Sequence, residues 1–171
     1  MNTAFRIDRA LLDRVHSDLD RKHAFAAERV GFIACRIGRA DGGALLLAHE
    51  YLVVLDEDYE YDPSPEVGAM MGSNAIRKAL QYTFNNDVAM LHVHRHEHTG
   101  RPRFSGLDLS ESAKFVPDFF KVRTDVPHGT LVLSRGSMFG LCWDPVSHKP
   151  APIDQLSVIG RPLSIFGRWW Q

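Results

Sequence analysis

The sequence contains little cysteine. Cys35 and Cys142 are the only two among 171 residues, and no CxxC pair occurs. This spacing excludes a zinc site built from neighbouring thiolates, and the missing PCxxC segment excludes a zinc nucleobase deaminase. Both cysteines stand in apolar stretches, FIACRI and FGLCWD. We therefore expect two reduced thiols in the core of the protein and no disulfide.

Long apolar runs and an excess of one charge are missing as well. No stretch is apolar over the roughly 20 residues that a membrane helix needs, and no signal-peptide pattern is present. The formal net charge is -1, so no basic field favours nucleic acid. A chain of this length suits one core better than two. We expect a single domain over residues 1–171 that is cytoplasmic and binds neither membrane nor nucleic acid.

Hydrophobic periodicity predicts both helices and strands. Helices are expected at Ile7–Ala24, Ser73–Asn85 and Leu107–Val116, and Ile76, Leu80 and Phe84 would share one face of the second helix. Strands are expected at Ala26–Gly38, Ala44–Leu55, from Val88 onward, Gly129–Ser134 and Ser137–Trp143, with one or two more after Pro150. This order predicts a fold of the α/β (α+β) class.

Turn signals refine this prediction at two places. Asp41-Gly42-Gly43 should join the first two strands as an antiparallel pair. His49 and Glu50 interrupt the second strand and indicate a bulge or a strand end. The acidic segment Asp56–Asp62 favours a solvated loop over a loop that contacts substrate. Trp169 and Trp170 could form a packed plug or an exposed contact, and the sequence leaves both open.

The most informative stretch is LHVHRHEHTGRPRFSGLD, which begins at Leu91 and ends at Asp108. Four histidines stand at every second position of it: His92, His94, His96 and His98. On a strand, alternate side chains point to the same face. Two such histidines and a carboxylate supply three ligands and leave one position open, which is the arrangement of a catalytic zinc site. We therefore expect Zn²⁺ at this stretch.

A second segment gives the histidine run a wider context. Glu28 stands just before the apolar strand that contains Gly31, and Ser105 and Asp108 follow the histidines as Ser-x-x-Asp. In this order the sequence resembles the JAMM/MPN (JAB) zinc metalloprotease family, in its bacterial-type stand-alone form. The resemblance extends over about Ile7 to Trp143. It implies a JAMM/MPN-like (cytidine-deaminase-like) mixed sheet flanked by helices.

The resemblance also implies a role for each residue of the motif. His94, His96 and Asp108 would hold Zn²⁺, with water at the open position. Glu28 would act as the catalytic base, and Ser105 would stabilise the oxyanion. The reaction would be hydrolysis of an amide or isopeptide bond after the C-terminus of a ubiquitin-like modifier. The partner would be a ubiquitin-like protein or its conjugate, whose extended tail could add a strand at a sheet edge.

The register of the histidines is the open point of this interpretation. No histidine is followed by proline, as the second one usually is in the family. Ser105 follows His96 by nine positions and His98 by seven, one more and one fewer than is usual. The ligand pair could thus be His94/His96 or His96/His98, and less readily His92/His94; we favour His94/His96. Ser105 could also serve as a helix cap.

Two other kinds of protein compete with this interpretation. A cupin-like barrel would use His92, His94 and Glu97 as ligands and would be entirely β. A metal-free MPN-like scaffold would keep the fold and lose the chemistry. The HxHxDH pattern of metallo-β-lactamase-like hydrolases fits neither start of the histidine run, because His96-Glu97 or His98-Thr99 stands where Asp-His is required.

Overall fold

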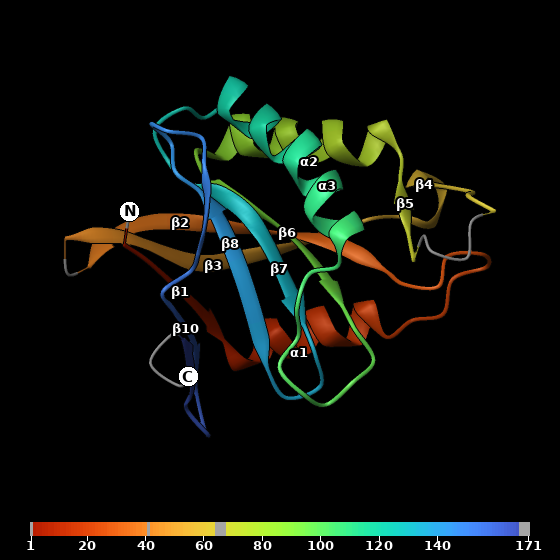
Figure 1. Cartoon of the computed structure of the whole chain (residues 1–171), viewed down its shortest axis with the longest axis horizontal. Coiled ribbons are helices and arrows are strands. Elements are labelled where there is room, and N and C mark those ends of the chain that lie inside the picture. Colours follow the sequence, from red (N-terminus) through yellow and green to blue (C-terminus); the bar gives the residue numbers. More distant parts are fainter. Residues whose placement is uncertain (1, 41, 64–67, 168–171) are drawn as a thin grey trace.

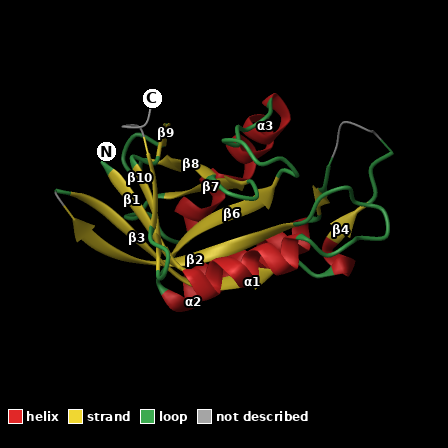
Figure 2. Cartoon of the chain, turned by 90° about the horizontal axis from the view of Figure 1, so that it is seen from below, coloured by secondary structure: helices red, strands yellow, loops and turns green. Residues whose placement is uncertain are grey.

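In the computed structural model, residues 2–40, 42–63 and 68–167 are described, and they form an α+β domain. A large, curled mixed sheet has helix α1 on one face and helices α2 and α3 on the other (Figure 1). Figure 2, viewed from the side of α1, shows this helix lying along β2. In the described part of the chain, no helix has the length and apolar character needed to cross a membrane.

The elements alternate along the chain much as the periodicity predicts. The α-helices are α1 (Arg9–Leu19), α2 (Ser73–Asn86) and α3 (Gly106–Phe115), and the 3₁₀ helices are η1 (Asp56–Asp58) and η2 (Val116–Lys121). The strands of the large sheet are β1 (Thr3–Asp8), β2 (Val30–Ala40), β3 (Gly43–Val53), β6 (Ala89–Arg95), β7 (His128–Leu133), β8 (Met138–Trp143), β9 (Pro150–Pro152), β10 (Gln155–Ile159) and β11 (Ser164–Gly167). Two short strands, β4 (Tyr59–Glu60) and β5 (Met70–Met71), form a separate ribbon.

Strand β6 lies near the middle of the large sheet. The strand order is β11-β10-β1-β3-β2-β6-β7-β8-β9, so β6 pairs with β2 on one side and with β7 on the other. The β2–β6 pair is antiparallel and the β6–β7 pair is parallel. All seven residues of β6 are buried, as a central strand covered on both faces requires. The histidine run therefore begins in the buried interior of the sheet.

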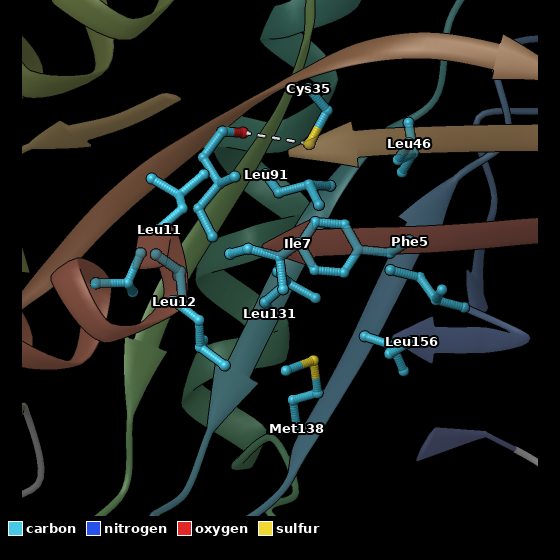
Figure 3. Close-up of a cluster of buried hydrophobic side chains, with 14 of the residues drawn as sticks. Phe5, Ile7, Leu11, Leu12, Cys35, Leu46, Leu91, Leu131, Met138 and Leu156 are labelled. Carbon is cyan, nitrogen blue, oxygen red and sulfur yellow. Dashed lines mark hydrogen bonds between the residues drawn. The ribbon is translucent and has the colours of Figure 1, made fainter. Parts of the chain in front are cut away.

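The sheet separates two apolar cores. The core on the α1 side contains both cysteines, which are free thiols as expected, together with side chains from seven strands (Figure 3). The core on the other side joins β2 and β6 to α2, α3 and η2 through residues such as Phe32, Met90 and Phe119. His92 lies at the edge of this second core, beside Phe32 and Phe115, and the His94 ring lies beside Phe104.

The prediction of one helix over Ile7–Ala24 is wrong at both ends. Residues Thr3–Asp8 form strand β1, in which Thr3, Phe5 and Ile7 point into the core at period two. Asp8 then caps α1, because its carboxylate accepts a hydrogen bond of 2.9 Å from Leu11 N–H. The strand pattern was hidden because Ile7 also fits the helical spacing of the leucines that follow.

The prediction for α2 is right in extent, and its apolar face is only partly the one that packs on the core. The fully buried positions are Ala75, Ala79 and Thr83, whereas Phe84 is 70% exposed. Ile76 and Leu80 are only partly buried against the same core. Small residues let the helix approach the sheet closely, so the larger apolar side chains lie at the margin of the contact. Side-chain size, which a hydrophobic pattern does not take into account, decides which face of α2 packs against the sheet.

Other predicted features differ from the structure in detail. The antiparallel β2–β3 pair is confirmed, and its register shifts so that Ala34 pairs with Glu50 and Cys35 with Ala48, which makes His49 the bulged residue. The tail after Pro150 contributes three strands, β9 to β11, where one or two were expected. Helix α3 ends at Phe115, two residues before Pro117, as expected, and Pro117 lies in the first turn of the 3₁₀ helix η2 that follows α3. Trp169 and Trp170 lie outside the described residues.

The acidic segment Asp56–Asp62 is solvated in large part, as its composition indicates, but its middle is buried. Asp58 is 3% exposed, and its carboxylate binds Lys78 Nζ at 2.6 Å and the Asn74 amide. Both partners belong to α2, so the segment is fastened to that helix. The Lys78 ammonium and the Asn74 amide hold the pKa of Asp58 below its usual value, against the opposite effect of burial.

Glycine at position 31 is required by the packing of β2. A Cβ atom there would overlap the ring of Tyr51 and lie 2.6 Å from its Cζ atom. The Tyr51 ring is held in place by its hydroxyl, which donates a 2.7 Å hydrogen bond to Asp18 of α1. Tyr51 thus links β3 to α1, and its ring packs over Gly31 of β2. Only glycine leaves room for this ring on the strand that follows Glu28.

We predict that Gly31→Ala destabilises the protein by about 1–3 kcal/mol, because the Tyr51 ring must move away. Gly38→Ala on the same strand is the matched control, since its Cβ would lie at an ordinary 3.6 Å from Leu45. It should change the free energy of unfolding by less than about 0.5 kcal/mol. Urea unfolding of both variants gives the comparison, and equal losses would contradict the role of Tyr51.

His128 ties the start of β7 to β6. Its Nδ1 accepts a hydrogen bond of 3.1 Å from Met90 N–H, and its Nε2 lies 2.9 Å from the carbonyl of Arg123. This pattern requires the neutral ring with the proton on Nε2. Burial lowers the pKa of His128 to about 4. The neutral imidazole is therefore part of the β6–β7 junction.

We predict that this histidine makes stability depend on pH. The pKa of about 4 in the folded state is below the reference value of 6.5, so the unfolded chain binds the proton first. The stabilisation is complete above pH 6.5 and declines as pH falls toward 4, by up to about 3 kcal/mol.

Urea unfolding over this pH range measures the effect. His128→Gln can keep both hydrogen bonds and should remove part of the pH dependence, whereas His49→Gln at an exposed position should leave the dependence unchanged. A His128→Gln curve parallel to that of the wild type would refute the assignment.

Candidate metal centre

The alternation of β6 places the histidines on the face that α3 covers. His92 and His94 are buried there, and His96 follows directly after the strand ends. The backbone N–H of His96 donates to Leu133 O at 2.9 Å, so this residue still follows the edge of β7. The ring centroids of His94 and His96 are 5.0 Å apart. A regular strand therefore fixes the spacing of these two imidazoles.

The pairing of β2 with β6 brings Glu28 to the same place. Val30 is opposite His94 in the antiparallel register, so Glu28, two residues earlier, continues toward His96 on the same face. Glu28, His94 and His96 each offer one ligand atom, and these atoms lie within 4.8 Å of one another. Two distant segments thus form one cluster through the register of a single strand pair.

Asp108 reaches the cluster from the first turn of α3. Its Oδ2 atom lies 3.6 Å from His94 Nε2 and 3.8 Å from His96 Nε2. Ser105 N–H donates to this oxygen at 2.7 Å, and Asp108 N–H donates to Ser105 Oγ at 3.1 Å. This reciprocal pair is a capping box, so the expected capping role of Ser105 is confirmed. The helix cap also aims the carboxylate at the histidines.

The donor set fits a divalent zinc ion. Two imidazole nitrogens and a carboxylate oxygen form a common catalytic zinc set, and tetrahedral ligands about 2.0–2.1 Å from zinc lie about 3.3–3.4 Å apart. The measured separations of 3.6 and 3.8 Å are close to this value. Both ring nitrogens of His94 are buried and make no hydrogen bond to the protein. A metal ion bound to Nε2 would satisfy one of these two nitrogens. A buried polar atom that is left without a partner costs about 1–3 kcal/mol of stability.

The other two histidines of the run lie in different surroundings. His92 lies deeper, between the rings of Phe32 and Phe115, with Nδ1 3.4 Å from Thr130 Oγ1. Burial lowers the pKa of His92 to about 3, so it stays neutral. His98 is exposed in the following loop. The geometry therefore favours the His94/His96 pair, and the cupin-like alternative disagrees with the α+β fold.

The two carboxyl groups of the cluster titrate differently. Burial raises the pKa of Glu28, and the neighbouring His94 and His96 only partly oppose it. Burial acts on Asp108 in the same direction, but the His94 ring and the Ser105 backbone and hydroxyl hold its pKa well below its usual range. Asp108 is thus a fixed anion, whereas Glu28 takes up a proton more readily.

The cluster forms one wall of a cavity of about 640 Å³. Ser105, Asp108, Ser112 and Phe115 line it along one face of α3, which spans about 15 Å. The opposite wall is largely apolar and comes from β5 and α2, with Met70, Met71 and Ile76. A cavity of this size and mixed lining is typical of a ligand site.

A buried arginine fixes the backbone next to Glu28. Arg29 is 2% exposed, and its guanidinium donates to Arg21 O at 2.8 Å, to Lys22 O at 3.0 Å and to Asp56 Oδ1 at 2.8 Å. The hydroxyl of Tyr59 accepts from Val30 N–H at 2.9 Å just beyond. The sequence motif assigns no role to Arg29 or Tyr59. Their positions in the sequence, next to the candidate base and within the acidic segment, were the available indications.

Comparison with known proteins adds no family to this description. The sequence matches no model of a protein family, and no curated protein is significantly similar to it. The case for a function therefore depends on the geometry of the cluster and on the motif that led to it.

We predict about one zinc ion per chain in the purified protein. His94→Gln and His96→Gln should each weaken zinc binding at least about 100-fold, more than the loss of a supporting residue costs. His98→Gln is the matched control and should retain zinc. Metal analysis measures the zinc content of each variant, and competition with a chromophoric chelator measures its zinc affinity. Zinc that survives His94→Gln but is lost in His98→Gln would shift the ligand pair to His96/His98.

Proposed function

We propose that the protein is a zinc-dependent hydrolase of the JAMM type that cleaves an amide or isopeptide bond after the C-terminus of a ubiquitin-like modifier. The observation that carries the proposal is the convergence of Glu28, His94 and His96 within 4.8 Å, beside Asp108. Three metal ligands and a nearby carboxyl group that can act as a base are what hydrolysis at a metal site requires.

The surroundings of each side chain indicate which residues would bind the metal and which would act as the base. His94, His96 and Asp108 would hold the metal, and Asp108 stays ionised because of its partners. Zinc, when bound, supplies a Lewis acid that polarises the carbonyl and makes water more acidic. Glu28, with its raised pKa, would take the proton of the attacking water and deliver it to the leaving amine. Paired carboxyls with separated pKa values are typical of acid–base sites.

Ser105 would stabilise the oxyanion. Its oxygen accepts the Asp108 N–H bond, so its hydroxyl hydrogen can be donated to a group in the cavity, which Ser105 lines. Preorganised donors of this kind strengthen in the transition state. The capping bond fixes the position of the oxygen, so the structural and catalytic roles support each other.

The shape of the cavity supports an extended substrate. A cavity that follows α3 for about 15 Å has room for four or five residues of extended chain. A flexible C-terminal tail that ends in the scissile amide fits such a groove, and this is the feature that ubiquitin-like modifiers share. The convergence of the motif residues is also the ground on which we propose the JAMM/MPN-like fold. We propose a cytoplasmic location because both cysteines are buried free thiols.

The decisive experiment is Glu28→Gln assayed on modifiers joined through their C-termini to the ε-amine of a lysine peptide that carries a fluorophore. We expect zinc to be retained and kcat to fall about 10²–10⁴-fold, which is the usual contribution of a general base. The panel should include ubiquitin-like proteins encoded beside this gene.

Glu111→Gln is the matched control, because Glu111 also lines the cavity but pairs with Lys114 at 2.6 Å. It should retain most of the activity. Cleavage that survives Glu28→Gln would remove Glu28 as the base. A protein that folds without zinc and binds a modifier without cleaving it would instead be a scaffold.

A further inference from the structure

Glu28 lies outside the regular part of β2, so the strand alone does not fix its side chain. Strand β2 begins at Val30. The backbone N–H of Glu28 instead donates to Gly68 O at 2.9 Å, and Gly68 also lines the cavity. Gly68 precedes β5, and it comes from a part of the chain to which the motif gives no role. The contact joins the candidate base to the opposite wall of the cavity.

Gly68 packs directly against the carboxyl group of Glu28. A Cβ atom at position 68 would lie 2.8 Å from both Cδ and Oε2 of Glu28, and 3.1 Å from its Cγ. Real Cβ atoms do not approach other heavy atoms below 3.0 Å. The carboxyl group therefore occupies the space that any side chain at position 68 would need.

The backbone of Gly68 gives no other reason for glycine. Gly42 and Gly160 have φ values of 74° and 134°, in the region that favours glycine, and Gly68 does not lie in that region. Gly106 and Gly136 have open space where a Cβ would stand. Gly68 differs from all four because the atoms that exclude its side chain belong to the candidate base.

The contact acts on the part of Glu28 that the other supports do not reach. Arg29 and Tyr59 hold the backbone on the C-terminal side of Glu28, through Arg21, Lys22 and Val30. A glutamate side chain still has three rotatable bonds, so a fixed backbone leaves many positions for the carboxyl group. Gly68 packs against the carboxyl end itself.

We propose that Gly68 is a positioning residue, whose missing side chain lets the carboxyl group of Glu28 lie in the cavity beside His94 and His96. This inference rests on the proposed function, because it assigns the contact a role in catalysis. The carboxyl group is the mobile end of a flexible side chain, so Gly68→Ala should be accommodated by rotation of Glu28. The substitution would then displace the base without unfolding the protein.

Crystal structures of the wild type and Gly68→Ala test the contact without any assay. We expect the Glu28 carboxyl group to be turned away, with His94, His96 and Asp108 superposing and zinc content unchanged. The Tm should fall by no more than about 3 °C, as for a minor local rearrangement in a protein of this size. Gly136→Ala is the matched control, and it should leave Glu28 in place.

Kinetics test the consequence on the same isopeptide panel. Gly68→Ala should lower kcat about 10²-fold or more with little change in KM, since a base is displaced and the cavity remains. In the Glu28→Gln background the same substitution should cost nothing further, because the two changes remove one function. Glu28→Asp should restore part of the lost activity in Gly68→Ala, because the shorter side chain clears the new methyl group.

The outcomes separate the two proposals. A Glu28 carboxyl group that stays in place in Gly68→Ala overturns the positioning role, and so does a loss of kcat that adds fully to that of Glu28→Gln. A displaced carboxyl group with unchanged kcat supports the contact and overturns Glu28 as the base. If Gly68→Ala does not fold, the Glu28→Ala/Gly68→Ala double variant decides: folding supports the clash, and failure to fold overturns it.

Discussion

The antiparallel pairing of β2 with β6 is the constraint on which the rest of the site depends. The register in which Val30 is opposite His94 sets which side chains meet at the end of the sheet. A slip by one residue would turn Glu28 to the other face and bring Arg29 toward the histidines. The register is protected on both sides: Tyr51 packs over Gly31 on one face, and Phe32 lies against His92 and Phe119 on the other. Core packing therefore specifies the chemistry of the cluster.

Much of this site is visible in the sequence because its parts obey local rules. Period two predicts that alternate histidines share a face, and Ser-x-x-Asp before a helix predicts a cap; Glu28, His94, His96, Ser105 and Asp108 do come together. What the sequence does not show is set by tertiary contacts. The orientation of α2 depends on how closely Ala75 and Ala79 approach the sheet, and the acidic segment is fastened by Lys78. Gly68 has meaning only once the Glu28 carboxyl group is located beside it.

The four histidines illustrate how burial divides one repeated residue into different roles. Each step of two along the run moves the ring centroid by 5.8, 5.0 and 5.9 Å in turn, from the sheet interior toward its end. His92 is enclosed by aromatic rings and stays neutral, His94 is buried without a hydrogen bond, His96 is partly open, and His98 is exposed. The two histidines that could hold a metal ion, His94 and His96, lie where the imidazoles are largely shielded from water and still line the cavity. Depth in the sheet, more than spacing in the sequence, selects the pair.

The proposed ligands and the proposed base are held by different means, and the proposed mechanism gives a reason for this difference. His94 is on a central strand and Asp108 is fixed by a helix cap, so both are rigid, as a metal site requires. Glu28 stands on a connection and is held by Arg29, Tyr59 and Gly68 through side-chain and backbone contacts. A residue that takes a proton at one atom and delivers it to another needs a small range of motion, which a strand interior would deny. Because the two supports are separate, the base can be altered while the metal ligands stay in place.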